Sequence, residues 1–312
     1  MTSETGHLQQ ALSEGRFAVV AECVPPSRPD ADAVRATAAA LRGKVDAVGV
    51  VDNRSEIMMS ALATAAILRA EGVEPIVHMT TRDRNRIALM SDVLGAQALG
   101  LRSFLCTSGD HQALGRERAS RNVFDLDSIQ LLSVLDHLRR EGVLFGDGRK
   151  VGPCDLYLGA TASPFGEPPE PQVIRLAKKV KAGADFLVTQ PVFDVEAFAR
   201  WLESVRPMGV VAEAAVLVGV LAPPSADRAR DLNETSPGMR IPDAVIERIG
   251  AVALAKQRGE AIALAAELIG RLRGLEGVRG VYLMTEGDNA ATVEVIEKAG
   301  LNRERRTVNA EV

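Results

Sequence analysis

The sequence is poor in aromatic residues, which favours an α/β fold over an all-β sandwich. Aromatic residues make up 4% of the 312 residues, while hydrophobic residues make up 46%. The core must therefore be filled by Ala, Val, Leu and Ile, which line parallel strands and the helices that cover them. The length suits one closed α/β barrel of roughly 250 residues with extra helices. We predict a single domain over residues 1–312.

Cysteine is scarce, and no CxxC pair is present. Cys23, Cys106 and Cys154 are far apart in the sequence, so neither a disulfide framework nor a zinc or iron–sulfur site is indicated, and we expect no metal. The net charge is −4, and like charges do not form the blocks that nucleic-acid surfaces require. Long apolar runs are also missing, which argues against a membrane partner. We expect a cytoplasmic protein with a small-molecule ligand.

Eight apolar runs of strand length alternate with segments of helical periodicity. Right-handed crossovers between parallel strands give either a closed barrel or an open doubly wound sheet. No GxGxxG follows the first run, and polar residues recur at the ends of most runs, which favours a (β/α)8 TIM barrel with extra helices. The predicted strands are 17–22, 46–51, 74–79, 103–107, 155–160, 185–189, 216–221 and 279–284. The predicted helices are about 5–15, 30–41, 55–70, 83–96, 127–141, 171–182, 194–205, 226–233 and 244–274, with a flexible tail over about 301–312.

Two carboxylic acids stand out at the predicted strand ends. Glu22 follows the apolar run AVVA, where desolvation would raise its pKa and let it hold a proton for delivery; a salt-bridged rim residue is the alternative. Asp110 follows Gly109, whose freedom lets the backbone bend or a flat ligand approach. There an ionised carboxylate would stabilise positive charge on a substrate, and a cap on a loop turn is the alternative.

Other polar residues are ambiguous when taken one at a time. His78 suits a hydrogen-bonded core histidine as well as a ligand contact. Arg175, Lys178 and Lys179 occur at i, i+3 and i+4, which places three cations on one side of a helix. That arrangement suits a phosphate group, although a solvated basic face explains the same spacing.

Taken together, these motifs resemble the methylenetetrahydrofolate reductase family. The resemblance lies in AECVPP with Glu22, IVHMTT with His78, TSGDHQ with Asp110, and KKVKAGADFLVTQPVFD with Lys179 and Gln190. It extends from about residue 17 to about residue 285. The family is a (β/α)8 barrel that binds flavin and reduces 5,10-methylenetetrahydrofolate to 5-methyltetrahydrofolate, usually with FAD and a reduced nicotinamide.

The resemblance implies a role for each matching residue. Glu22 would be the general acid that opens the substrate ring to an iminium cation. Asp110 would be the second catalytic residue, in contact with both flavin and folate. Gln190 and Arg228 would join Glu22 and Asp110 in binding folate. The cofactor-binding set would be Asp52, His78, Thr80, Ser108, Gly109, Asp110, Thr161, Arg175, Lys178 and Lys179.

Several positions depart from the commoner family pattern. Ser108 stands where Arg is frequent, and Thr161 and Phe165 stand where Tyr and His are frequent, so FMN is an alternative to the favoured FAD. Leu232 replaces an aromatic residue that stacks on nicotinamide, and Arg228 replaces a Gln. Direct use of NADH or NADPH is therefore in question, and the resemblance implies a homo-oligomer or a complex with an electron-transfer subunit.

Two other functions are compatible with the same residues. A pterin-binding barrel could pass a methyl group to a corrinoid or thiol without redox chemistry. A non-catalytic barrel could serve as a subunit of a larger complex, although the joint presence of Glu22, Asp110 and Gln190 argues against it.

Overall fold

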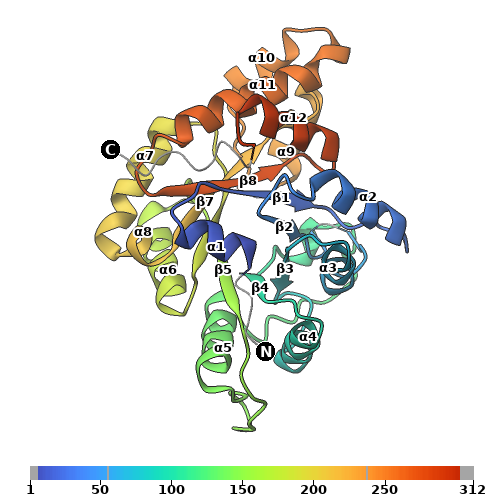
Figure 1. Cartoon of the computed structure of the whole chain (residues 1–312). Coiled ribbons are helices and arrows are strands. Elements are labelled where there is room, and N and C mark those ends of the chain that lie inside the picture. Colours follow the sequence, from blue (N-terminus) through green and yellow to red (C-terminus); the bar gives the residue numbers. More distant parts are fainter. Residues whose placement is uncertain (1–5, 55, 237, 303–312) are drawn as a thin grey trace.

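Eight parallel strands close into a barrel in the computed structural model, which describes residues 6–54, 56–236 and 238–302 (Figure 1). The strands follow one another around the barrel in chain order, and the last pairs with the first. The predicted (β/α)8 TIM barrel is therefore confirmed. The strands are β1 (Ala18–Cys23), β2 (Ala47–Val50), β3 (Pro75–Thr80), β4 (Ser103–Thr107), β5 (Tyr157–Ala162), β6 (Phe186–Pro191), β7 (Ala215–Leu221) and β8 (Val278–Met284).

The first two strands of the barrel are buried on both faces. All residues of β1 and of β2 are buried, as expected for parallel strands covered by helices outside and by packed side chains inside. Gly49 and Gly159 make room for large rings. A Cβ on Gly49 would lie 2.2 Å from the hydroxyl of Tyr282, and one on Gly159 would lie 2.3 Å from the ring of Phe186.

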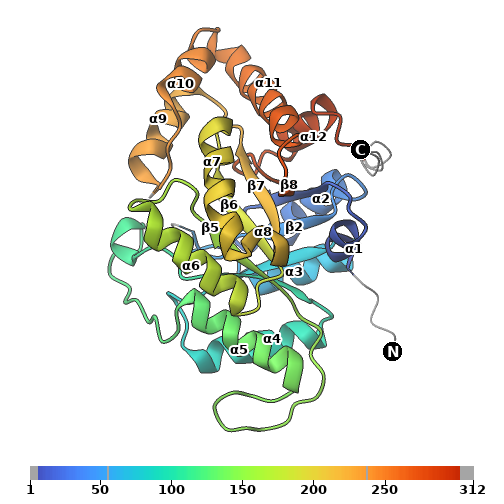
Figure 2. The same cartoon turned by 90° about the vertical axis from the view of Figure 1, so that its left-hand side faces the viewer.

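Helices surround the barrel, and the predicted alternation of strand and helix is present throughout. In the view of Figure 2, α9, α10 and α11 extend beyond the strands. The α-helices are α1 (His7–Ser13), α2 (Ala31–Leu41), α3 (Ala61–Ala70), α4 (Arg86–Ala98), α5 (Ser128–Glu141), α6 (Pro169–Lys181), α7 (Val195–Val205), α8 (Val210–Glu213), α9 (Ala226–Thr235), α10 (Asp243–Gly250), α11 (Leu254–Leu272) and α12 (Asn289–Lys298), with short 3-10 turns η1 (Gln112–Leu114) and η2 (Arg206–Met208).

Some predicted helix boundaries were wrong. The helix predicted from residue 55 begins at Ala61, because Ser60 accepts the hydrogen bond from the Ala63 amide and caps it. The helix predicted from residue 83 begins at Arg86 and is capped by Asn85. Residue 55, where the first of these helices was predicted to start, lies outside the described residues. Asp83, the predicted start of the second, belongs to the loop before α4.

The chain after residue 240 also differs from the prediction. The single helix predicted over 244–274 is two helices, α10 and α11, and Arg248 joins them through ion pairs with Glu260 and Glu267. Helix α12 was not predicted; Asp288 caps it by accepting from the amide of Ala291. Most of the predicted tail, residues 303–312, lies outside the described residues.

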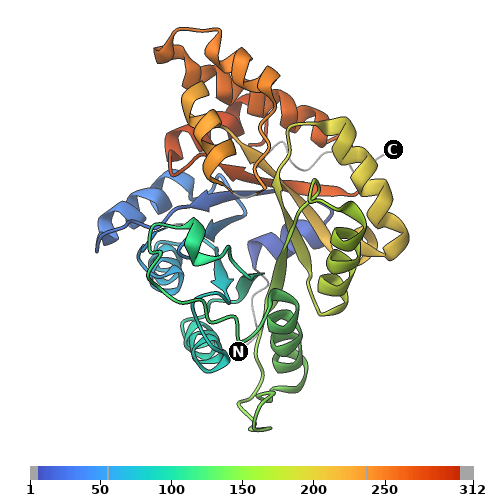
Figure 3. The same ribbon diagram turned by 180° about the vertical axis from the view of Figure 1, so that it is seen from behind.

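Helix α1 covers the amino-terminal end of the barrel. Glu74, just before β3, accepts a hydrogen bond from the first amide of the helix, that of His7, and Arg279 of β8 donates to the carbonyl of Leu12. The helix lies across the strands in Figure 1, whereas the opposite view in Figure 3 has the loop after β4 in front. Helix α1 and the loop after β4 therefore lie at opposite ends of the barrel. Within the described residues, no helix combines the length and apolar character that a membrane span needs.

Candidate functional site

Glu22 is a buried carboxylic acid near the carboxyl end of β1. The residue is 6% exposed, and its Oε1 has no hydrogen-bond partner among the described residues. The nearest cation is Arg54, whose Nη1 lies 3.6 Å from that oxygen, too far for a hydrogen bond. Desolvation raises the pKa of Glu22; Arg54 opposes this shift and Glu286 adds to it. The surroundings of Glu22 therefore favour the protonated carboxyl group, and one oxygen of this group has no hydrogen-bond partner among the described residues.

His78 and Tyr282 meet inside the barrel. The Tyr282 hydroxyl lies 3.0 Å from Nε2 of His78. Since β3 and β8 are not neighbours in the barrel, this hydrogen bond crosses its interior. Desolvation lowers the pKa of His78 to about 3, so the imidazole is neutral. Desolvation and the nearby Glu22 raise the pKa of Tyr282, so its phenol also stays neutral.

Asp110 lies in the loop after β4 and is exposed, unlike Glu22. Gly109 before it has a φ of +78°, and a Cβ there would lie 2.4 Å from Cγ2 of Thr80. Only glycine fits this backbone conformation and this close approach. Ser108 is tied to the same region, because its hydroxyl accepts from the first amide of α5, that of Ser128, at 3.1 Å.

Asp52 and Thr80 hold β2 and β3 together. The carboxylate of Asp52 accepts from the Thr80 amide at 2.9 Å and pairs with Arg84. Burial raises the pKa of Asp52, and Arg84 opposes that shift. Both residues were predicted to contact the cofactor, and the structure shows that their contacts within the chain join the carboxyl ends of β2 and β3.

The three predicted cations of α6 separate into two environments. Lys179 points to the barrel, where its Nζ donates to the carbonyl of Thr161 at 2.6 Å and lies 3.3 Å from the Thr161 hydroxyl. Desolvation, followed by repulsion from Arg175, lowers the pKa of Lys179 to about 8. Arg175 and Lys178 are exposed. Thr161 and Lys179 are thus brought together, whereas Arg175 and Lys178 lie on the exposed surface of α6.

Gln190 lies at an irregularity between β6 and β7. The register shifts between Val188 and Pro191, and the Thr189 hydroxyl fills the gap by donating to the Gln190 carbonyl and accepting from the amide of Gly219. The Gln190 amide approaches the chain after α9, within 2.8 Å of a Cβ built on Gly238. The bulge thereby turns Gln190 toward the carboxyl end of the barrel.

Arg228, the other predicted folate contact, is engaged by two acids. Its Nε and Nη2 donate to Glu286 at 2.9 and 2.5 Å, and it pairs with Asp231 on its own helix. Glu286 follows β8 with a φ of +53°, a conformation that non-glycine residues seldom adopt. The ion pair joins α9 to the end of β8.

Three residues of the site were not predicted. Arg54, Arg82 and Tyr282 all lie at or near strand ends, where charged and aromatic side chains are candidates in a barrel of this kind. Arg54 and Arg82 stand next to predicted strand-end residues, in DNR and TTRD. Their position in the sequence was available as a signal, but nothing in it gives the direction of the side chains.

Residues 7–300 match the family model described as methylenetetrahydrofolate reductase. The chain belongs to this family. A probable methylenetetrahydrofolate reductase (NADPH) from Caenorhabditis elegans is 28% identical over 162 residues, 51% of this chain and 22% of the worm protein. A 5,10-methylenetetrahydrofolate reductase from Pectobacterium carotovorum is 25% identical over 222 residues, 69% of this chain and 67% of that protein. The chain thus spans less than a quarter of the worm member of the family.

Solved structures resemble this member of the family in fold. One is a Clostridium thermocellum protein described as binding two copies of 5-methyl-5,6,7,8-tetrahydrofolic acid, with a TM-score of 0.61 at 13% identity over 94% of this chain and 97% of that one. Another is EDTA monooxygenase from Chelativorans, with a TM-score of 0.56 at 12% identity over 94% and 95%. At these identities the likeness shows the barrel fold alone.

Proposed function

We propose that this chain reduces 5,10-methylenetetrahydrofolate to 5-methyltetrahydrofolate with the help of a bound flavin. The observation that carries the proposal is Glu22, a buried acid with an unpartnered oxygen at the carboxyl end of the barrel in a member of this family. Desolvation holds its pKa above the ordinary range, which is the property that a general acid needs near neutral pH.

The residues around Glu22 fit a flat, phosphate-bearing cofactor. Gly109 presents bare backbone beside Thr80. Lys179 supplies a cation. Its Nζ contacts the two oxygens of Thr161, and it has no carboxylate partner among the described residues. His78 is neutral and Asp52 is fixed to β3. His78, Thr80 and Gly109 would hold the isoalloxazine ring, and Ser108, Thr161, Arg175, Lys178 and Lys179 would hold the phosphate.

The chain's part in the reaction is to deliver a proton and stabilise a cation. Glu22 donates its proton to the ring nitrogen of the substrate, so that the five-membered ring opens to an iminium cation. Asp110 lies on the exposed loop with its carboxylate free to face that charge. Gln190 donates to the edge of the pterin, and Arg228 contacts folate in the orientation set by Glu286. The bound flavin supplies the hydride that the exocyclic carbon accepts.

The residues of this chain also favour one type of flavin and one route of electron supply. FAD is favoured over FMN by the family, while Ser108 and Thr161 at the phosphate end make FMN the alternative. Leu232 is buried in α9, so the chain offers no aromatic ring there for a nicotinamide. We propose that electrons arrive through a partner subunit in the cytoplasm, in preference to direct reduction by NADH or NADPH.

Purification of the chain with its bound cofactor tests the proposal directly. We expect a yellow protein with a flavin absorption spectrum, a released mass equal to FAD, and conversion of 5,10-methylenetetrahydrofolate when the flavin is reduced chemically. A colourless protein that still binds folate would contradict flavin-dependent reduction and favour methyl transfer without redox chemistry. Rapid flavin reduction by NADH or NADPH alone would contradict the proposal that a partner subunit supplies the electrons.

A further inference from the structure

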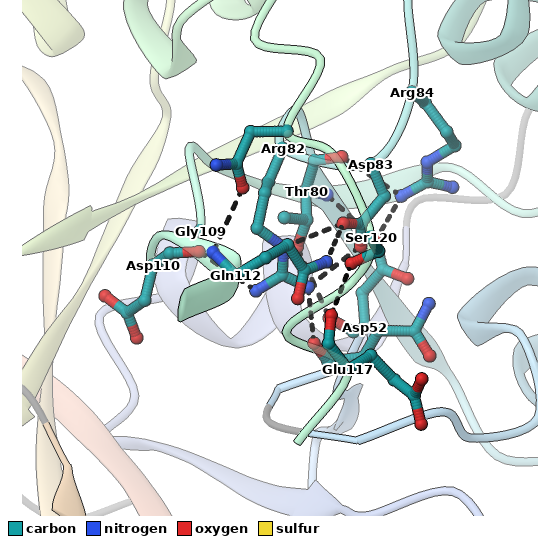
Figure 4. Close-up of polar contacts among 12 residues, drawn as sticks. Asp52, Thr80, Arg82, Asp83, Arg84, Gly109, Asp110, Gln112, Glu117 and Ser120 are labelled. Carbon is teal, nitrogen blue, oxygen red and sulfur yellow. Dashed lines mark hydrogen bonds and ion pairs between the residues drawn. The ribbon is translucent and has the colours of Figure 1, made fainter. Parts of the chain in front are cut away.

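Arg82 is a buried arginine that the proposed reaction does not use. It follows β3, is 4% exposed, and lies where the loops after β2, β3 and β4 meet (Figure 4). Burying a guanidinium is costly unless its donors are satisfied. The hydrogen-bond partners of Arg82 therefore indicate its role in the structure.

The backbone of Arg82 extends the pairing of β3 and β4 beyond the strands. Its amide donates to the Ser108 carbonyl at 3.0 Å, and its carbonyl accepts from the Val123 amide at 2.7 Å. The start and the end of the long loop after β4 are thus both attached to this one residue. That loop carries Gly109 and Asp110.

The guanidinium reaches the two neighbouring loops through backbone carbonyls. Nη1 donates to the carbonyl of Asp110 at 3.2 Å, and Nη2 donates to that of Asn53 at 2.6 Å. Asn53 has a φ of +42°, so its carbonyl is turned out of the usual extended direction. In Figure 4 the carboxylate of Asp110 points away from Arg82, which holds only the backbone of this residue.

Asp83 fixes the orientation of the guanidinium. Its two oxygens accept from Nε and Nη2 of Arg82 at 2.7 and 2.8 Å, a bidentate pair. Gln112 holds Asp83 in turn, with its Nε2 2.7 Å from the carboxylate. The Asp83 hydrogen bonds raise the pKa of Arg82, so the cation is permanent.

We infer that Arg82 is a positioning residue that sets where the carboxylate of Asp110 lies relative to the bound flavin and folate. This inference rests on the proposed function. Arg82 touches neither ligand in this scheme; it acts by holding the backbone of Gly109 and Asp110 against Thr80 while leaving the Asp110 side chain free. A lysine cannot replace it, because one ammonium cannot bind Asp83 in bidentate fashion and reach carbonyls on two loops.

The variants Arg82→Ala and Arg82→Lys test this inference against a matched control. Arg139 is also partly buried and donates to two carboxylates, Asp136 and Asp185, and to the carbonyls of Leu156 and Gly183, but it lies before β5 and β6 at the other end of the barrel. Arg139→Ala should lower the midpoint of thermal unfolding without changing the flavin. Both Arg82 variants should instead raise the flavin reduction potential, because the negative charge of the displaced Asp110 carboxylate no longer opposes reduction of the flavin. They should also lower kcat/KM for methylenetetrahydrofolate about 10- to 100-fold.

Three further readouts separate positioning from general loss of structure. Hydrogen exchange of the flavin-free Arg82→Ala protein should quicken over residues 108–114 and 122–124, and guanidinium chloride should restore slow exchange and turnover where sodium chloride does not. Adding Arg82→Ala to Asp110→Asn should leave the potential of Asp110→Asn unchanged, since both changes act through one carboxylate.

The inference is overturned if Arg82→Ala keeps the wild-type potential and kcat/KM, or if exchange over the loop is unaltered. It is also overturned if the effects of Arg82→Ala and Asp110→Asn on the potential simply add. A wild-type chain that binds no flavin at all would instead mark the failure of the proposed function, and the inference would fall with it.

Discussion

Glu22 gives the site an acid whose ionisation is opposed by burial. Its pKa is raised above the ordinary value of 4.5, chiefly by desolvation. As pH rises above 4.5, the unfolded chain loses this proton first, so the folded protein binds more protons and loses stability until its own pKa is passed. Below 4.5 both states are protonated and the effect vanishes.

Glu22→Gln should therefore raise the unfolding midpoint at about pH 8 and have little effect near pH 4.5. The same variant should bind flavin normally but reduce methylenetetrahydrofolate at least about 100-fold more slowly, because the general acid is lost. Thermal unfolding measured by circular dichroism over this pH range is the check. An equal difference at every pH would mean that Glu22 is ionised as easily in the folded state as in the unfolded chain.

Lys179 should make flavin affinity depend on pH. Its pKa is lowered to about 8 by burial, so the cation is present below that pH and is lost above it. Wild-type affinity should fall roughly tenfold from about pH 7 to about pH 9, as the protonated fraction falls. Titration followed by quenching of flavin fluorescence would measure this.

Lys179→Met should bind flavin weakly and with no such dependence on pH. Lys181, an exposed lysine on the same helix, provides the matched control, and Lys181→Met should behave as wild type. Should Lys179→Met keep the wild-type pH profile, the phosphate lies elsewhere.

At the level of single residues, the sequence predicted which side chains could be reactive better than it predicted their hydrogen-bond partners. Glu22 was recognisable because an acid after four apolar residues is bound to be desolvated, and its burial agrees. Arg82 was not recognisable, because TTRDRN reads equally well as the polar start of a helix. Its role depends on carbonyls of Asn53 and Asp110, which lie 29 and 28 residues away.

Strand β6 places Gln190 by means of a bulge that depends on one hydroxyl. Thr189→Val would leave the amide of Gly219 without its acceptor inside the barrel, at a cost of about 1–3 kcal/mol, and would loosen Gln190. We expect a lower free energy of unfolding and a higher KM for folate. Chemical denaturation and steady-state kinetics would measure the two effects.

Thr64→Val is the matched control for this change. Thr64 is also fully buried, but its hydroxyl has no hydrogen-bond partner among the described residues. Its removal should leave stability unchanged or increase it. If both variants lost the same stability, the bulge hydrogen bonds would not be the cause.

Strands were predictable as elements and helix ends were less so. A buried parallel strand is a continuous apolar run, which the sequence displays directly, and the observed strands begin within two residues of their predicted starts. Helix starts depend on which of several polar residues acts as the cap. Asp83 was taken as the start of α4, yet its carboxylate is bound to Arg82, and Asn85 caps the helix instead. The break between α10 and α11 has no proline to mark it.

The buried contacts of helix α1 and the candidate site lie at opposite ends of the barrel, so we expect stability and reactivity to depend on different residues. Helix α1 closes the amino-terminal end with Leu8 fully buried, while the candidate site lies at the other end. Leu8→Ala should cost about 2–5 kcal/mol of unfolding free energy and leave the flavin spectrum and potential unchanged. Leu99→Ala, at a leucine that is 54% exposed, is the control and should have little effect. A shifted flavin potential in Leu8→Ala would show that the two ends are coupled.

Closure of the barrel cannot be deduced from the alternation of strands and helices alone, because an open doubly wound sheet has the same alternation. The polar residues at strand ends and the lack of a GxGxxG after the first strand favoured the barrel. The pairing of β1 with β8 decides the matter. It brings Glu22 and Gln190 on their strands, and Asp110 and Glu286 on the loops after theirs, to the same end of one molecule, although the extremes are more than 260 residues apart.

The most direct test of the account is to mix the chemically reduced protein with 5,10-methylenetetrahydrofolate and follow the flavin absorbance. We predict that the flavin reoxidises as one equivalent of 5-methyltetrahydrofolate forms, and that Glu22→Gln reoxidises at least about 100-fold more slowly. A flavin that stays reduced in the wild-type protein, or one that reoxidises equally fast in Glu22→Gln, would contradict the proposed chemistry.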